Sequence, residues 1–324
     1  MCTAVSMNSG DHYFGRNLDL EFSYRETVVV TPRHFPFSFK CMPAQHTHLA
    51  MIGMAAVSDG YPLYYDATNE AGLSVAALNF PGYAHYAPPS DTKDNIAPYE
   101  LIEWILMQCS SAAQARALLA RIHLAAIPFS DELPLSPLHF IISDNHESIV
   151  LEPMKDGLRI HDNPVHVLTN NPPFDYHLLN LSNYMQLSNQ PPLNRLDASL
   201  SLTPYSRAMG AIGLPGDLSS ASRFVRAAFM RSNSLCSDSP EDGVTQFFHI
   251  LDSVAHVRGS VMVEGKPEIT VYSSCCNTTR GIYHYTTYEN RQITAIDMHK
   301  ENLDGAKLCV YPLIRKQQFL QYNG

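Results

Sequence analysis

The sequence predicts an α+β fold in which antiparallel sheets are covered by helices in layers. Two observations support this class. Segments with strand character come first, then helical segments, and the alternation repeats before the chain returns to strands. Clusters of turn residues also separate neighbouring strands by only a few positions, which is typical of hairpins and not of a doubly wound parallel sheet.

The N-terminal strands are short and bounded by turn residues. Residues 2–7 and 12–20 flank the turn cluster at 8–11, so we expect them to form a hairpin. A third strand is expected at 28–31, and the apolar segment 72–80 is expected to be a buried strand.

Helices are expected in two parts of the chain, each of which contains two of them. Residues 98–109 place apolar side chains on one face, and a capping-box pattern at Ser111 predicts a second helix that continues through Ile122. Two further helices are expected at 221–232 and 241–257. The apolar residues of the last helix recur at helical spacing, and we assign them to the core.

The remaining expected strands are 138–142, 148–152, 157–161, 165–168, 269–274, 280–287 and 291–297. The chain contains no recognisable linker, repeat or low-complexity tract. We therefore expect residues 1–324 to form a single domain.

Composition and charge exclude several classes of protein. The chain has 324 residues, of which 45% are hydrophobic, and this is ample for a large core. The net charge of −9 argues against nucleic acid or an anionic membrane surface as a partner. We find neither the basic and apolar regions of a signal peptide nor an apolar run of about 18 residues, so no membrane span is expected.

Cysteine and histidine usage indicates free thiols and no metal. The 7 cysteines are scattered, odd in number and without a Cys-x-x-Cys spacing, which favours a reducing, cytoplasmic compartment. The 15 histidines include no pair four residues apart that would bind metal from one helix face. His46 and His48 lie two apart in a polar segment, a spacing that more often has no ligand role.

Cys2 is the residue that points most directly to chemistry. A small residue after Met1 allows the methionine to be removed, and we expect this removal. The mature chain would then carry a thiol and a free α-amine on one residue, as N-terminal nucleophile amide hydrolases do. Chance alone puts cysteine at a given position about 2% of the time, since 7 of 324 residues are cysteine.

Two charged residues on the returning strand of the first hairpin could complete this site. Arg16 would favour the thiolate form of Cys2, and Asp19 would bind and orient the α-ammonium group. Positions 16 and 19 face opposite sides of a regular strand, so both reach Cys2 only if the strand bends or ends near Leu18. The alternative is an ion pair on the surface.

Two asparagines and one arginine are further candidates. Asn79 and Asn170 each follow a predicted strand, where a side-chain amide can donate to a developing oxyanion or merely cap a turn. Arg223 lies in the first turn of a predicted helix, where the helix dipole disfavours a cation. A cation retained there suggests a functional role.

Six separated segments resemble the choloylglycine hydrolase family, which contains bile salt hydrolases and penicillin V acylases. They read MCTAV, FGRNLDLEFSY, NEAGLSVAALNFPGY, VLTNNPPFDYHLLNLSNY, GLPGDLSSASRFVRAAF and TTYENRQITAIDMHKENLDG. The resemblance covers nearly the whole chain. It implies the four-layer αββα sandwich of N-terminal nucleophile hydrolases, a homo-oligomer that is commonly a tetramer, and no metal or cofactor.

The resemblance also implies which residues act. It places the nucleophile and its catalytic partners on Cys2, Arg16, Asp19, Asn79, Asn170 and Arg223. By family position, the residues expected to contact substrate are Leu18, Tyr24, Phe129, Leu133, Leu138 and Arg207. The loop 127–135 is apolar and broken by prolines, so it either lines a steroid pocket or packs on the core. Arg207 is equally compatible with an ordinary surface position.

The implied reaction is hydrolysis of glycine- or taurine-conjugated bile acids by a Cys2 thiolate. An α-amine titrates close to neutral pH, which suits a general base. The segment Asn-Phe-Pro-Gly at Asn79 resembles the bile salt branch, whereas penicillin V acylases tend to carry Tyr at that position. The alternatives are a penicillin V acylase or other N-acyl amidase, a non-catalytic binding protein, and an enzyme that uses an internal cysteine.

Overall fold

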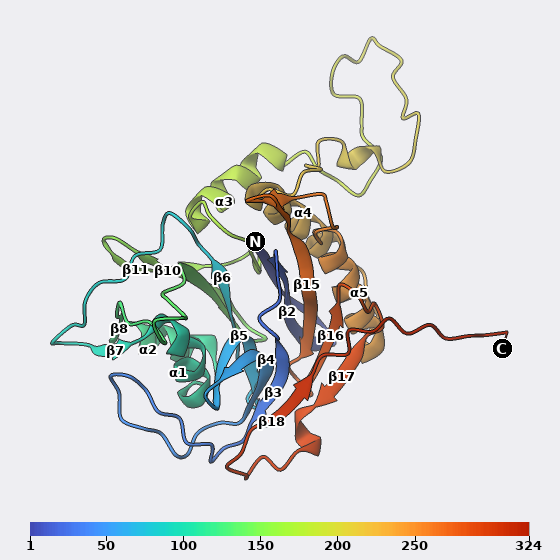
Figure 1. Cartoon of the computed structure of the whole chain (residues 1–324). Helices are drawn as coiled ribbons and strands as arrows, with labels where there is room; N and C mark the ends of the chain where they lie inside the picture. Colours follow the sequence, from blue (N-terminus) through green and yellow to red (C-terminus); the bar gives the residue numbers. More distant parts are fainter. Residues whose placement is uncertain (324) are drawn as a thin grey trace.

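Two large antiparallel sheets form the centre of the computed structural model, which describes residues 1–323 (Figure 1). The six-stranded sheet has the order β12 (Val167–Leu168), β1 (Cys2–Ser9), β2 (Asp11–Leu20), β15 (Ile269–Asn277), β16 (Ile282–Thr287) and β17 (Thr294–Asp297). The eight-stranded sheet has the order β11 (Gly157–Asp162), β10 (Ser148–Met154), β9 (Leu138–Ser143), β6 (Ser74–Asn79), β5 (Tyr61–Asn69), β4 (Met51–Ser58), β3 (Thr27–Thr31) and β18 (Cys309–Pro312).

Helices cover the outer face of each sheet. The helices α1 (Leu101–Gln108) and α2 (Ala112–Leu119) pack on the eight-stranded sheet, and α4 (Ser220–Asn233) and α5 (Pro240–Asp252) pack on the six-stranded sheet (Figure 1). The result is a four-layer αββα sandwich. The predicted fold class is therefore confirmed.

The smaller elements lie at the ends of the sandwich. They are β7 (Asp94–Ile96) paired with β8 (Ile122–Leu124), β13 (Met262–Val263) paired with β14 (Lys266–Pro267), α3 (Phe174–Leu181), and the 3-10 turns η1 (Pro98–Glu100), η2 (Ser182–Tyr184), η3 (Met209–Ala211) and η4 (Met298–Lys300). The helix α3 follows the end of β12 and so lies close to the start of β1.

The core has two parts, one on each side of the eight-stranded sheet. In β3, Val28 and Val30 join the cluster between the sheets, whereas Val29 joins the cluster under α1 and α2. In β4, Ile52 likewise joins the cluster between the sheets, and Met51 joins the cluster under the helices. Successive side chains of a strand point to opposite faces, so both faces of these strands are buried. Each such side chain contributes about 1.5–3 kcal/mol by its burial.

The two over-long helix predictions are wrong at their C-terminal ends. The helix that begins after Ser111 ends at Leu119, because Ile122 already belongs to β8 and pairs with β7. Its capping box is half formed: Ser111 Oγ accepts from Gln114 N, but the Gln114 side chain accepts from Ser110.

The helix expected at 241–257 ends at Asp252. Beyond it Ser253 and Val254 form tight turns, and His256 N donates to Thr270 Oγ1 at 2.8 Å. The chain therefore bends from α5 toward β15.

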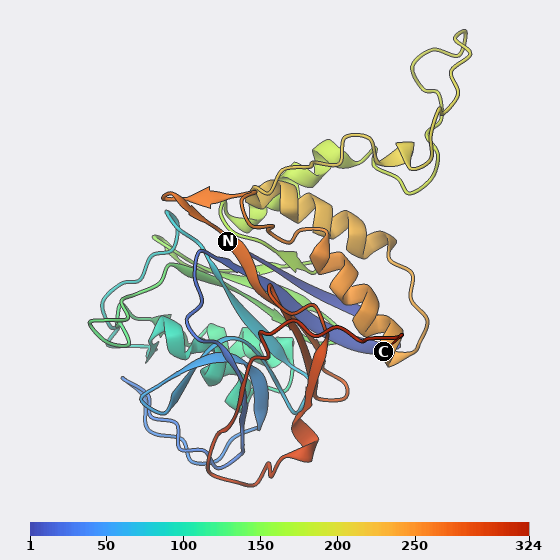
Figure 2. The same cartoon turned by 45° about the vertical axis from the view of Figure 1, so that its right-hand side comes forward.

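The segment 189–208 extends away from the sandwich in both views (Figures 1 and 2). Every residue in it is exposed, including Leu193, Leu196 and Tyr205, which are 77%, 81% and 86% exposed. We call it the arm. The two ends of the arm meet in a hydrogen bond of 2.9 Å from Ser188 N to Gly210 O. Within the described residues, no helix has both the length and the apolar character needed to cross a bilayer.

Candidate active site

Cys2 is the first residue of β1, which lies between β12 and β2 within the six-stranded sheet. It is 3% exposed and pairs with Leu18 across the first hairpin. It lines a cavity of about 660 Å³. The predicted hairpin thus exists, and it places Cys2 in the wall of this cavity.

Arg16 and Leu18 lie on the same face of β2 and line the same cavity as Cys2. The Arg16 side chain is fully buried and donates to the carbonyl oxygens of Tyr65, at 3.0 Å, and Ala77. Burial lowers the pKa of Arg16, but the nearby acidic groups, Cys2 first among them, outweigh burial and raise the pKa above its ordinary value. A permanent cation beside the thiol favours the thiolate.

Asp19 faces the helical layer, on the other side of β2. Its Oδ1 accepts from Thr270 Oγ1 at 2.6 Å, and its Oδ2 lies 3.8 Å from His256 Nε2 and 4.0 Å from Arg223 Nη1. Asp19 and Arg16 therefore approach the start of β1 from opposite faces of the sheet.

The irregularity near Leu18 lies in the neighbouring strand. β2 continues to Leu20, while β15 contains a bulge, since Thr270 pairs with Asp19 and Tyr272 with Leu18. The expected bend or end of the strand near Leu18 is therefore not seen in β2.

Asn170 joins several parts of the site. Its Oδ1 accepts from Cys2 N and from Arg223 Nη2, both at 2.7 Å. Its Nδ2 donates to Asn79 O at 2.7 Å. Asn170 thus touches the nitrogen that would become the α-amine of Cys2, and it fixes the end of β6 next to it.

Arg223, in the first turn of α4, is fully buried. It donates to Cys2 O, to Thr3 Oγ1 at 2.6 Å and to Leu218 O at 2.9 Å. Burial lowers its pKa below the ordinary value, although the charges of Asp19 and Cys2 oppose this shift. The cation at the start of this helix therefore holds the backbone oxygen of Cys2 and the side chain of Thr3.

Asn79 ends β6 and lines the cavity. Its backbone oxygen is held by Asn170, but its side-chain amide has no hydrogen-bond partner within residues 1–323. The amide is only half-buried. It is therefore free to donate to a bound molecule.

The apolar walls of the cavity include most of the residues expected to contact substrate. Cys2 shares the cavity with Leu18, Tyr24, Phe129, Leu133 and Leu138. The loop 127–135 thus lines the cavity with part of its length. Arg207 does not line it and lies on the exposed arm.

Other lining residues were not predicted from the sequence. They are Leu20, Val57, Leu63, Tyr65, Tyr99 and Ile102, among others. Val57, Leu63 and Tyr65 belong to the hairpin of β4 and β5, and Tyr61 of this hairpin lies with its ring centroid 6.0 Å from that of Phe129 in the loop 127–135. The signal that could have found this hairpin is its turn pair Asp59-Gly60, in which both residues have positive φ.

Met1 directly precedes β1, and its ammonium group is held by two hydrogen bonds. Its ammonium group donates to Glu268 Oε2 at 2.8 Å and to Asp19 O at 2.5 Å. Burial raises the pKa of Glu268, but the contacts with His256 and the terminal ammonium outweigh it and lower the pKa. With Met1 attached, the nitrogen of Cys2 is a peptide nitrogen and cannot accept a proton.

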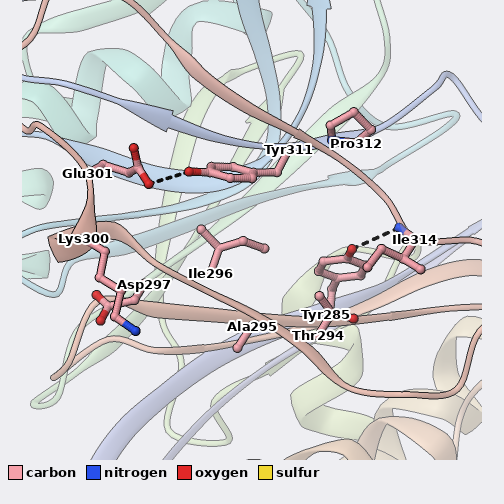
Figure 3. A pocket seen from close by; sticks show the side chains of 10 residues that line it. All are labelled: Tyr285, Thr294, Ala295, Ile296, Asp297, Lys300, Glu301, Tyr311, Pro312 and Ile314. Atoms are coloured by element: carbon pink, nitrogen blue, oxygen red, sulfur yellow. Dashed lines mark hydrogen bonds between the residues drawn. The ribbon is translucent and has the colours of Figure 1, made fainter.

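A second cavity of about 310 Å³ lies between the edge strands β17 and β18 (Figure 3). The Tyr311 hydroxyl donates to Glu301, and Ile314 N donates to Tyr285 Oη at 3.0 Å. None of its lining residues is shared with the cavity of Cys2. It is therefore separate from the candidate active site.

A sandwich of two antiparallel sheets between helices, with a nucleophile opening a central strand, is the architecture of N-terminal nucleophile amide hydrolases. The family model of linear amide C–N hydrolases, choloylglycine hydrolase family, matches residues 2–311. The chain therefore belongs to the choloylglycine hydrolase family.

Individual relatives resemble the chain over its full length. It is 50% identical to the bile salt hydrolase/transferase of Lactiplantibacillus plantarum, with 100% of both chains covered, and 42% identical to that of Clostridium perfringens, with 96% of each covered. A crystal structure of a mutant conjugated bile acid hydrolase from Clostridium perfringens matches with a TM-score of 0.92 and 40% identity, covering 100% of both chains.

A more distant structure shares the fold alone. Penicillin V acylase from Agrobacterium tumefaciens matches with a TM-score of 0.74 and 18% identity, covering 96% of this chain and 90% of that one.

Proposed function

We propose that the chain hydrolyses the amide bond of glycine- and taurine-conjugated bile acids. The observation that carries the proposal is that Cys2, Arg16 and the free amide of Asn79 line one largely apolar cavity of about 660 Å³. A cavity of this size and character suits a rigid apolar ligand such as a steroid. The bile-acid names of relatives that match the full chain support the same substrate class.

The reaction begins with the removal of Met1, which frees the α-amine of Cys2. This amine takes the thiol proton, and the sulfur attacks the amide carbonyl to form a C–S bond. The amine then gives the proton to the nitrogen of glycine or taurine as the C–N bond breaks. Water hydrolyses the thioester and releases the free bile acid, with the amine accepting the proton of the water.

Asparagine side chains would stabilise the tetrahedral oxyanion. The Asn79 amide has no other partner, and one N–H of Asn170 remains after its bond to Asn79 O. An oxyanion donor typically contributes about 3–4 kcal/mol to lowering the barrier. The Oδ1 of Asn170 would meanwhile orient the α-amine, because it already accepts from Cys2 N.

Charged residues would set the ionisation state of Cys2. Arg16 favours the thiolate from the cavity side. Asp19, whose Oδ2 is buried without a hydrogen bond in the described chain, would balance the positive charge that forms on the amine. Arg223 would keep Asn170 and the backbone of Cys2 in place.

Assembly into a homo-oligomer, as a tetramer, is part of the proposal. The arm supports it, because exposed leucine and tyrosine side chains on a projecting segment are the kind of surface that a second copy covers. Arg207 lies on this arm, so it would reach a substrate only in the cavity of a neighbouring subunit. Seven free thiols support a cytoplasmic location.

A comparison of substrates tests the proposal. Purified protein is incubated with glycocholate, taurocholate and penicillin V, and kcat/KM is measured for each. We expect the two bile acid conjugates to be hydrolysed far faster than penicillin V. Faster hydrolysis of penicillin V would instead assign the chain to the acylase branch.

A further inference from the structure

A buried histidine lies beneath the two asparagines of the site. His139, on β9, pairs with Leu78 of β6 and is fully buried. Its ring stacks on Phe80 with 4.3 Å between ring centroids and 5° between planes. Its Nε2 lies 2.9 Å from Thr169 O. This one ring therefore touches the residue that follows Asn79 and the residue that precedes Asn170.

His139 is held from the other side by Glu152 of β10. The distance from His139 Nδ1 to Glu152 Oε1 is 3.3 Å, and both side chains are fully buried. Burial raises the pKa of Glu152, but the contacts with His139 and His161 outweigh it and lower the pKa to about 2. Glu152 is thus a carboxylate. The Glu152 carboxylate and the backbone oxygen of Thr169 therefore hold the two ring nitrogens of His139 from opposite sides.

The same group of side chains holds the turn that contains Asn170. Glu152 Oε1 also accepts from Phe174 N at 2.9 Å. His177 Nε2 lies 2.8 Å from Asn170 O, and burial lowers the pKa of His177 to about 4, so its ring is neutral near pH 7. The backbone of the turn 169–174 is therefore fixed at its first, second and last residues.

We propose that His139, fixed by Glu152, is a positioning residue that keeps Asn79 and Asn170 aligned with Cys2; this inference rests on the proposed function. Neither His139 nor Glu152 lines the cavity, so neither is expected to touch substrate. An active site needs its donors held to within a fraction of an ångström by such supporting contacts. The physical link is direct, because Asn170 Nδ2 also bonds Asn79 O.

The test must separate positioning from simple loss of stability. His139→Phe keeps a ring for stacking on Phe80 but removes both ring nitrogens, and it leaves the buried Glu152 carboxylate with only one of its two histidine contacts. The double variant H139F/E152Q removes that charge, while the amide oxygen of glutamine can still accept from Phe174 N. His161→Phe is the matched control, because His161 Nε2 lies 3.4 Å from Glu152 Oε2 but forms no hydrogen bond with the turn.

Turnover and stability are then measured together for glycocholate. We expect H139F/E152Q to melt close to the wild type while its kcat falls about 10- to 100-fold, with KM within about threefold. His161→Phe should keep kcat within about threefold of the wild type. A double variant that is folded and retains wild-type kcat would overturn the inference, as would a loss confined to KM.

A crystal structure of H139F/E152Q gives a readout that does not depend on substrate. The distance from Asn170 Oδ1 to the Cys2 nitrogen, 2.7 Å here, should lengthen. An unchanged distance would contradict the inference. An inactive wild type would count against the proposed function alone, and the crystallographic distance would still decide the role of His139.

Discussion

Asn170 is the residue at which the site converges. Its two polar atoms meet the Cys2 nitrogen, Arg223 and the backbone of Asn79, which come from three distant parts of the chain. The sequence places Asn170 after a strand, and the family resemblance gives it a catalytic role. It does not reveal that the oxygen of this side chain faces Cys2 while the nitrogen faces Asn79.

Alanine substitutions of the two asparagines should have different effects on stability. Asn79→Ala should lower kcat about 100-fold with little change in melting temperature, because its amide bonds no other group of the described chain. Asn170→Ala should lower kcat at least as much and also destabilise the protein, because it leaves Nη2 of the buried Arg223 without an acceptor. Steady-state kinetics and thermal melts check both variants. Equal melting temperatures for the two would contradict this distinction.

Glu152 should make the fold sensitive to acid. Its pKa is about 2 in the folded chain against an ordinary value of 4.5, so the folded state resists protonation of this group. The stability it contributes, about 3 kcal/mol, is complete above pH 4.5 and is lost as the pH falls toward 2. Urea unfolding at several pH values should show the wild type exceeding Glu152→Gln near pH 6, with the gap closing in acid. A stability difference between the two proteins that does not change with pH would contradict the lowered pKa of Glu152.

At the residue scale, sequence spacing and the family resemblance identified the polar residues of the site but not the direction in which each side chain points. Arg16 and Asp19 were rightly expected to lie on opposite faces of a strand, and they remain there. Arg207 was expected either to contact substrate or to be an ordinary surface residue, and it lies on the exposed arm, outside the cavity of its own chain. Tyr65 and Tyr99 reach the cavity through tertiary packing, which no local pattern encodes.

Element prediction succeeded where turn residues mark the strand ends. The hairpins of β1 with β2 and of β9 with β10 follow such turns. β4 and β5, by contrast, were not predicted, although Asp59-Gly60 marks the turn between them; both faces of β4 are buried, so its sequence lacks the alternation of a half-exposed strand. The helix α3 was missed because it starts directly after Pro172 and Pro173, and the short edge strand β18 has no apolar pattern.

The packing of α5 on the six-stranded sheet requires a glycine. A Cβ at Gly243 would lie 2.4 Å from Cζ and from Oη of Tyr13, on β2. In an exposed helix the change Gly→Ala stabilises by about 1 kcal/mol. Here Gly243→Ala should destabilise by about 1–3 kcal/mol, because helix or ring must move.

Denaturant unfolding of Gly243→Ala, beside the exposed control Thr245→Ala on the same helix, measures the effect. The control should change stability by no more than about 0.5 kcal/mol. A stabilised Gly243→Ala protein would show that α5 does not pack as closely as described.

At the scale of the whole molecule, the sandwich explains why the first residues of the chain can form the site. β1 lies inside the six-stranded sheet, and Cys2 is held by Leu18 of β2 on one side and by Asn170, which follows β12, on the other. Cys2 thereby lies in the cavity that residues of both sheets and of the loop 127–135 line. The layered class was predictable from the order of elements, whereas the order of strands within each sheet was not.

The arm should be needed for assembly and not for the fold. Because Ser188 and Gly210 already meet, residues 190–208 can be replaced by a short Gly-Ser linker without moving the sandwich. We expect the shortened chain to remain folded and to become monomeric or dimeric, whereas the intact chain assembles further. Light scattering coupled to size-exclusion chromatography measures the mass. Identical assembly of both proteins would contradict the role of the arm.

The most direct test of the central claim is release of free glycine from glycocholate by the wild type and by Cys2→Ala, with the mass of each protein measured beforehand. The account predicts a wild type that has lost Met1 and releases glycine, and a folded Cys2→Ala protein that releases essentially none. Glycine release by Cys2→Ala at a rate near that of the wild type, or by a wild type that retains Met1, would contradict the claim that Cys2 with its free amine performs the reaction.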